Sequence, residues 1–283
     1  MPRILIAFAA IAVLSGCAST PQNAQTTQSP AAQQPERSEK MRQLEAVKAA
    51  CMKDKGFDYH PMIMNMKQAT AADVKRISGD YAAMKESRAK EGYGVFYIFV
   101  HPDARNIQKV DPGGKDARPM DKTQAQAMEK AEHECERKAV KQVLNRDLGN
   151  ARNAFDMAQK LVEAARKREL DGDPELASLA ATFGQCMKAK GYKVTQLNPT
   201  SVEGRGRTLF ASQIPGVKEV ENGGQSIMIG GEAPELTPAQ AQPYLDREIK
   251  DALDDLECGK DFYAKYLPKK EKIDDRVQKE IGL

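Results

Sequence analysis

The chain has 283 residues, and its 43 Lys and Arg nearly balance its 40 Asp and Glu, which leaves a formal net charge of +3. So small a charge gives no electrostatic surface for nucleic acid, and the sequence predicts no nucleic-acid partner. The chain has one long apolar run, close to its N-terminus. That distribution excludes a protein that crosses a membrane several times.

The N-terminus has the layout of a secretory signal. Arg3 supplies a short positive region, residues 4–13 are all apolar, and Leu14-Ser15-Gly16-Cys17 follows. An apolar run of this length is too short to span a membrane as a helix. We therefore predict a signal peptide over residues 1–16.

The four residues that end at Cys17 resemble a bacterial lipobox. In that family the cysteine sulfur takes a diacylglyceryl group and the signal is cut just before it, so the resemblance implies that Cys17 is the lipidated, palmitate-bearing first residue. Several acyl chains hold a protein on a membrane where one holds it only weakly. By analogy with lipoproteins of two-membrane bacteria, Ala18 implies an outer-membrane protein that faces the periplasm. The alternative is an ordinary secretory signal with a chance cysteine.

A polar stretch over residues 17–40 follows the signal. It is rich in Gln, Thr, Ala and Pro and shows no apolar period. Such a composition buries too little surface to offset chain entropy. We expect a flexible tether that holds the folded part away from the bilayer.

Four cysteines remain after the lipobox: Cys51, Cys135, Cys186 and Cys258. An even number in an exported protein predicts two disulfides. Zinc is the rival interpretation, but no two of these cysteines lie close together in the sequence and no CxxC motif occurs. Structural disulfides are therefore the preferred interpretation.

The surroundings of the cysteines repeat along the chain. Residues 51–57 read CMKDKGF and residues 186–192 read CMKAKGY, which are identical at five of seven positions. Residues 123–127 (TQAQA) and 237–241 (TPAQA) form a second matching pair, and each precedes a cysteine. This agreement indicates an internal duplication.

The duplication predicts two modules with one disulfide each. We expect module A over residues 41–147, a connecting helix over 148–170, and module B with a charged tail over 171–283. Pairing within modules joins Cys51 to Cys135 and Cys186 to Cys258, although the other two connectivities stay open. In each module a glycine follows the first cysteine helix, where a helix end favours a left-handed residue.

Apolar spacing gives a coarse secondary structure. It predicts helices over residues 71–90 and 151–168, and Asp173 opens a further helix. Residues 95–100 (VFYIFV) predict a strand that is buried on both faces, and residues 217–229 predict a hairpin around Asn-Gly. The expected fold is α+β and helix-rich, made of duplicated disulfide-braced modules that each carry a small sheet or hairpin. Thr123 and Thr237 are candidate N-caps.

A short segment near the first cysteine suggests copper. On an extended strand His60, Met62, Met64 and Met66 would share one face, and thioethers and imidazole are copper ligands. The segment resembles the Met-rich motifs of exported copper-handling proteins. The competing interpretation is a core strand in which methionine fills space. Pro61 and the absence of methionine from the second copy favour that interpretation.

Other candidate sites are weaker. His60, His101 and His133 are the only histidines and come from separate segments, so a zinc site is disfavoured against surface histidines. Ser87 and Lys90 match the S-x-x-K motif of penicillin-binding enzymes, but its companion motifs are absent. Residues 204–207 (GRGR) are interpreted as a flexible basic loop.

The sequence favours an envelope lipoprotein with a non-catalytic binding or scaffolding ectodomain. Its expected partners are the membrane, through Cys17, and an envelope protein or peptidoglycan. No cofactor is indicated. The alternatives are a periplasmic copper-handling lipoprotein and a cell-wall-modifying enzyme. A binding role predicts an exposed apolar or charged patch, whereas an enzyme predicts a deep polar cleft between the modules.

Overall fold

The computed structural model describes residues 30–61, 69–104, 121–221, 226–229 and 236–282. The predicted signal peptide, Cys17, and Met62, Met64 and Met66 lie outside the described residues. Within those residues, no helix has both the length and the apolar character needed to cross a membrane.

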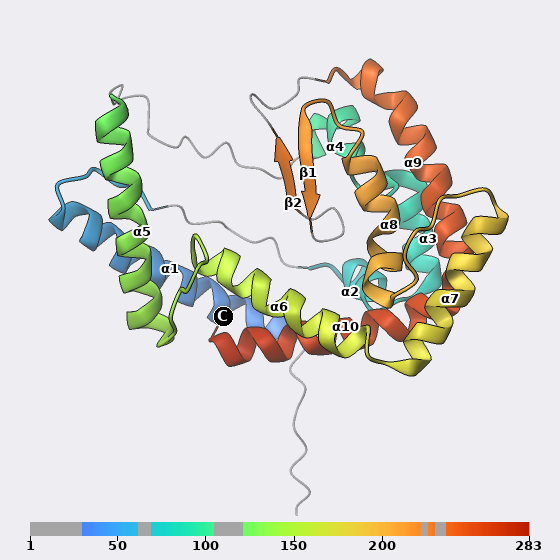
Figure 1. The fold of residues 1–283 in the computed structure, drawn as a ribbon, viewed down its shortest axis with the longest axis horizontal. Helices are drawn as coiled ribbons and strands as arrows, with labels where there is room; N and C mark the ends of the chain where they lie inside the picture. Colours follow the sequence, from blue (N-terminus) through green and yellow to red (C-terminus); the bar gives the residue numbers. More distant parts are fainter. Residues whose placement is uncertain (1–29, 62–68, 105–120, 222–225, 230–235, 283) are drawn as a thin grey trace, which may run out of the picture.

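Helices make up almost all of the described chain (Figure 1). The helices of the N-terminal part are α1 (Pro30–Asp54), α2 (Ala71–Ile77), α3 (Tyr81–Glu91), α4 (Tyr97–Val100), the 3-10 turn η1 (Pro102–Ala104) and α5 (Lys122–Leu144). Those of the C-terminal part are α6 (Ala154–Leu170), α7 (Pro174–Ala189), α8 (Pro199–Ala211), α9 (Pro238–Cys258) and α10 (Lys260–Ile281). Among the described residues, strands occur only in β1 (Val217–Glu221) and β2 (Ser226–Ile229), which pair antiparallel with Val220 opposite Ile227.

The predicted α+β class with a small sheet in each module is therefore wrong, and the fold is helical. The apolar run over residues 95–100, expected to be a strand, ends in α4 instead. A continuous apolar run does not distinguish a buried strand from a buried helix turn. Here the carboxylate of Glu248 accepts the backbone N–H groups of Val95 and Phe96, so this segment docks on α9 rather than on a sheet.

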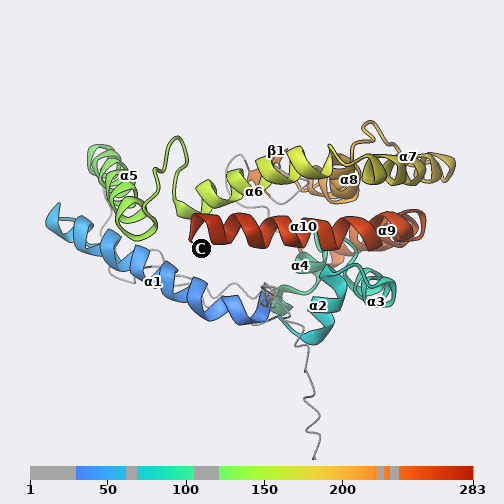
Figure 2. The ribbon, with the colours of Figure 1, turned by 90° about the horizontal axis from the view of Figure 1, so that it is seen from below.

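The helices form layers around α9 and α10 (Figure 2). Helices α6, α7 and α8 lie on one side of these two helices, and α2, α3 and α4 lie on the other. The α1–α5 pair lies toward the end of the molecule that holds the C-terminus of α10: α5 stands beyond that terminus, and α1 runs back past it (Figures 1 and 2). Segments assigned to the two predicted modules thus pack together, because α3 and α4 of the first lie against α9 of the second.

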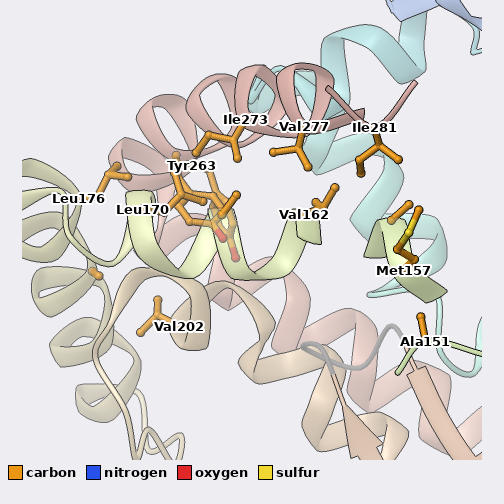
Figure 3. Close-up of a cluster of buried hydrophobic side chains, with 14 of the residues drawn as sticks. Ala151, Met157, Val162, Leu170, Leu176, Val202, Tyr263, Ile273, Val277 and Ile281 are labelled. Atoms are coloured by element: carbon orange, nitrogen blue, oxygen red, sulfur yellow. The ribbon is translucent and has the colours of Figure 1, made fainter. Parts of the chain in front are cut away.

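The main core lies between α6 and α10 (Figure 3). Val162 and Leu170 of α6 and Ile273 and Val277 of α10 are buried there, and the whole Tyr263 ring lies in the same cluster. Burying one such side chain stabilises a fold by about 1.5–3 kcal/mol. A second cluster joins α4, α8 and α9, where the Phe96 ring stacks on Tyr244 with centroids 4.7 Å apart.

Both predicted disulfides are present, and their pairing is confirmed. Cys51 of α1 joins Cys135 of α5, and Cys186 of α7 joins Cys258 of α9, each with a Cα–Cα distance of 5.5 Å. The first bridge is buried, whereas Cys186 and Cys258 are each partly exposed.

The repeated sequence around the first cysteine of each pair folds the same way twice. Gly56 and Gly191 adopt left-handed φ values of 82° and 87°. The following aromatic N–H donates to the carbonyl of Met52 in one copy and of Met187 in the other, both at 3.0 Å. These bonds are those of a Schellman C-cap, in which glycine tolerates the left-handed conformation. The backbone therefore repeats along with the sequence.

Several local predictions need correction. α1 begins at Pro30, so residues 30–40, assigned to the tether, are helical. The helix predicted over residues 71–90 is two helices, α2 and α3. Thr123 is not an N-cap, because Asp121 caps α5 through Gln124, whereas Thr237 caps α9 as predicted. A side chain that accepts the N3 backbone N–H fixes where a helix begins.

Candidate functional site

Three acidic side chains point into the protein from one face of α9. Glu248, Asp251 and Asp255 have 0%, 3% and 0% of their surface exposed. Their spacing of three and four residues places them on the face that also carries buried Leu245 and Ala252. Carboxylates at such depth require partners, because an unpaired buried charge is strongly disfavoured.

Glu248 holds the backbone that leads into α4. Its two carboxylate oxygens accept N–H groups from Tyr93, Val95 and Phe96, each at 2.8 Å. Burial raises the pKa of Glu248, and the three backbone hydrogen bonds oppose that rise. The Glu248 carboxylate thus supplies the hydrogen-bond acceptors that a neighbouring strand or a preceding helical turn would otherwise give these N–H groups.

Asp255 and Asp251 bind two arginines from different helices. Arg88 of α3 donates to Asp255 at 2.6 Å, and Arg205 of α8 donates to Asp251. The Tyr93 hydroxyl donates to Asp251 at 2.6 Å. We call Arg88, Arg205, Glu248, Asp251 and Asp255 the buried ion cluster. It ties α3, α8 and α9 together at fixed positions, since buried pairs lose several kcal/mol when one partner is removed.

The run over residues 204–207, predicted to be a flexible loop, is instead part of α8. Gly206 is buried beneath the Tyr93 ring, and a Cβ added at Gly206 would lie 2.0 Å from Tyr93 Cζ. Glycine is therefore needed for close approach rather than for flexibility. The two arginines of the run leave on different sides: Arg205 joins the ion cluster, and Arg207 donates to the Tyr93 carbonyl at 3.2 Å.

Two grooves flank α8. The first, which we call the α3–α8 groove, has a volume of about 410 Å³ and an apolar part formed by Met84, Tyr263 and Leu267. Four cations and four acids also line it: the cations are Arg76, Arg88, Arg207 and Lys270, and the acids are Glu91, Glu203, Glu271 and Asp274. Burial raises the pKa of Glu271, and the negative charges of Asp275 and Asp274 raise it further.

The second groove, the α6–α8 groove, is larger, with a volume of about 640 Å³. Its wall is unevenly charged: the cations are Arg166, Lys167, Lys193, Arg205 and Lys270, against the acids Glu163 and Glu203. Four serine and threonine side chains also line it: Thr195, Thr200, Ser201 and Thr208. Glu203, Gly204 and Lys270 belong to both grooves, so α8 and α10 separate the two.

Of the two metal sites considered from the sequence, the described residues test only the zinc site. His60 is exposed, and its nearest acidic partner is Asp58 at 3.8 Å. Its proposed partners Met62, Met64 and Met66 lie outside the described residues, so the copper hypothesis stays a prediction. Across the described segments, no three His, Cys, Asp or Glu side chains gather closely enough to hold a metal ion.

Only one residue of the S-x-x-K pair lines a groove. Ser87 lines the α3–α8 groove, whereas Lys90 does not, and the Lys90 ammonium lies 5.9 Å from the Tyr97 ring centroid. The two side chains leave α3 toward different surroundings. Activation of a serine by a lysine needs the two groups within hydrogen-bond reach.

Sequence reasoning missed the buried ion cluster and the grooves, although one signal was available. Glu248, Asp251 and Asp255 fall on the same helical face as Leu245 and Ala252. Acids on an apolar face indicate buried partners of opposite charge. Which arginines supply those charges depends on long-range packing and could not be read from spacing.

No family model, curated protein or solved structure matches this chain. Function is therefore argued below from the residues and geometry of the chain itself.

Proposed function

We propose that the protein is a lipid-anchored envelope protein whose helical body is a non-catalytic binding or scaffolding module for a protein or cell-wall partner. The Leu14-Ser15-Gly16-Cys17 motif supports the anchor. The grooves on either side of α8 support the binding role. The outer membrane and its periplasmic face follow by analogy from Ala18.

The α6–α8 groove is the observation that carries the binding role. It opens to solvent, and its volume of about 640 Å³ falls within the usual range for binding pockets. One wall is α8, which the buried ion cluster fixes through Arg205. A wall held in place before binding lowers the entropy cost of association.

The hydrogen bonds that the buried acids make also favour a binding role over a catalytic one. Glu248 accepts three backbone N–H groups, and Asp255 accepts from Arg88 and from the Tyr263 hydroxyl. A general acid or base must reach a substrate proton, usually within about 3 Å. Groups engaged in this way hold helices together and leave the groove walls to contact a partner.

The anchor is tested by membrane fractionation of cells that produce the full chain. We expect the wild type in the membrane fraction, with acyl groups on Cys17 by mass spectrometry. C17S should move to the soluble fraction. An unacylated wild-type protein that begins at a residue other than Cys17 would contradict the anchor without touching the binding role.

The binding role is tested with a photo-crosslinking amino acid in intact cells. Leu209 lines the α6–α8 groove and is 42% exposed, whereas Phe155 is 55% exposed and lies outside both groove linings. We expect a defined crosslinked product from position 209 and none from position 155. Equal products from both positions, or none from either, would contradict a binding role for this groove.

A further inference from the structure

We infer that the α6–α8 groove takes an acidic peptide segment of a partner protein, with the partner's carboxylates bound by Lys167 and Lys193. The inference rests on the proposed binding function and names the chemistry of the partner. It follows from the distribution of charge, hydroxyl groups and apolar surface within the groove.

Three of the five cations in this groove already have acidic partners. Arg166 makes a two-pronged contact with Asp274, and Arg205 pairs with Asp251. Lys270 lies 3.9 Å from Glu203. These side chains give the groove its shape, but most of their charge is already balanced.

Lys167 and Lys193 are different. Both are exposed at the groove, Lys167 from α6 and Lys193 from the α7–α8 connection. Within the described part of the chain, neither forms an ion pair within 4.0 Å. The groove therefore presents two uncompensated ammonium groups from separate segments, which attract an anionic ligand.

The rest of the lining favours a peptide over a phosphate-rich polymer. Leu209 lines the groove and is 42% exposed, so it offers apolar surface to a ligand. Thr195 and Thr208 offer hydroxyl groups that both donate and accept hydrogen bonds. A peptide supplies carboxylates, backbone amides and apolar side chains together, and it matches this mixture of partners.

The α3–α8 groove differs, because its four cations face four acids and give no preference for an anion.

The test is fluorescence anisotropy with the mature, lipidated protein in detergent. The probe is a labelled octapeptide of Glu, Gly and Leu in which every second residue is Glu, and the control peptide has Gln in place of Glu. We expect binding of the Glu peptide that weakens as salt is raised, because exposed charges are screened. The Gln peptide should bind at least tenfold more weakly.

Two charge-matched variants locate the site. K167Q/K193Q should weaken binding of the Glu peptide about tenfold, whereas K138Q/K141Q on α5 should leave it unchanged. All four lysines are exposed, and the α5 pair lines neither groove, so the fold is kept in both variants. Circular dichroism of both double variants checks that the fold is kept.

Three results would overturn the inference: no binding of the Glu peptide, equal weakening by both double variants, or preference for inorganic polyphosphate over the peptide. Each would leave the proposed function standing if position 209 still crosslinks a partner. Absence of that crosslink, with peptide binding intact, would instead remove the proposed function and leave a groove that binds acidic peptides in solution.

Discussion

The two disulfide-bonded helix pairs, α1–α5 and α7–α9, share a framework but differ in what their facing surfaces carry. Each pair has a cysteine about one turn before a glycine C-cap, and each bridge closes a loop of similar length, with separations of 84 and 72 residues. Met52 and Met187 are both fully buried next to their cysteines. The duplicated residues are those that define the helix end and its bridge.

The charged interiors of the two pairs are not alike. In α1–α5, Lys48 donates to Glu132 at 2.8 Å and lies 3.2 Å from Glu136. Burial lowers the pKa of Lys48, but the hydrogen bond to Glu132 and the charge of Glu136 outweigh it and raise the pKa. In α7–α9, the α9 face instead carries the three acids of the buried ion cluster, whose partners come from outside the pair.

The difference shows that the shared cysteines and glycine C-caps fix each helix pair, whereas the buried charged residues that differ between the pairs decide which other helices pack on it. The first pair satisfies its buried lysine internally and stands at one end of the molecule. The second recruits α3 and α8 through arginines, and the grooves lie beside those helices. The proposed binding groove is lined by α6, the α7–α8 connection, α8 and α10, and the second pair contributes by fixing α8 through Arg205.

The largest contrast is expected between Glu248 and Glu136. E248A leaves three buried N–H groups without an acceptor and should lower the free energy of unfolding by about 5 kcal/mol. Glu136 accepts one backbone N–H, from Ala154 at 2.9 Å, and contacts Lys48. E136A should therefore cost about 2 kcal/mol. Urea unfolding measures both, and equal losses would show that Glu248 has no special role in holding α4.

The disulfides come next. Loops of 84 and 72 residues predict a loss of about 4 kcal/mol for either C51A/C135A or C186A/C258A. The first replacement should cost somewhat more, because Cys51 and Cys135 are 6% and 0% exposed and their removal opens a cavity. Urea unfolding of the two double variants checks the order, and a larger loss for the partly exposed second bridge would reverse it.

A smaller and equal effect is expected at the repeated glycines. Gly56 and Gly191 have left-handed φ values, and an added Cβ at either position would meet no atom within 4 Å other than the adjoining backbone and chain neighbours. G56A and G191A should each cost about 1–2 kcal/mol, from backbone strain alone. Thermal unfolding should show matching shifts. A several-fold difference between them would break the equivalence of the two C-caps.

The smallest effect is a difference in pH dependence. Hydrogen bonds from Lys190 and Lys250 lower the pKa of Asp254, so its stabilisation is present above the unfolded pKa of about 3.9 and is lost as pH falls toward the folded value. D254N should cost about 1 kcal/mol at pH 7, and this cost should shrink steadily as pH falls below about 3.9. A cost that does not change with pH would assign the effect to packing instead.

The first pair has a comparable contact, because Lys55 occupies the position of Lys190 in the repeat and pairs with Glu134 of α5. The hydrogen bond from Lys55 lowers the pKa of Glu134, but both side chains are exposed. E134Q should therefore also lower the free energy of unfolding at low salt, and this loss should vanish at about 1 M salt. A salt-independent effect at Glu134 would remove the contrast with half-buried Asp254.

Sequence alone could predict the repeated elements but not their assembly. The glycine C-caps, the Thr237 N-cap and both disulfide pairings depend on local patterns, and the structure has all of them. The α4 segment was mistaken for a strand because its conformation depends on Glu248, which lies about 150 residues away. The grooves escaped prediction for the same reason, since their walls come from helices far apart in the chain.

The most direct test of the binding surface combines the crosslinker with the lysine variants. A crosslinker at position 209 is placed in the wild-type, K167Q/K193Q and K138Q/K141Q chains and activated in intact cells. We expect the partner product in the wild type and in K138Q/K141Q, and its loss in K167Q/K193Q. An equally strong product in all three chains would show that the partner does not depend on the charge of the α6–α8 groove.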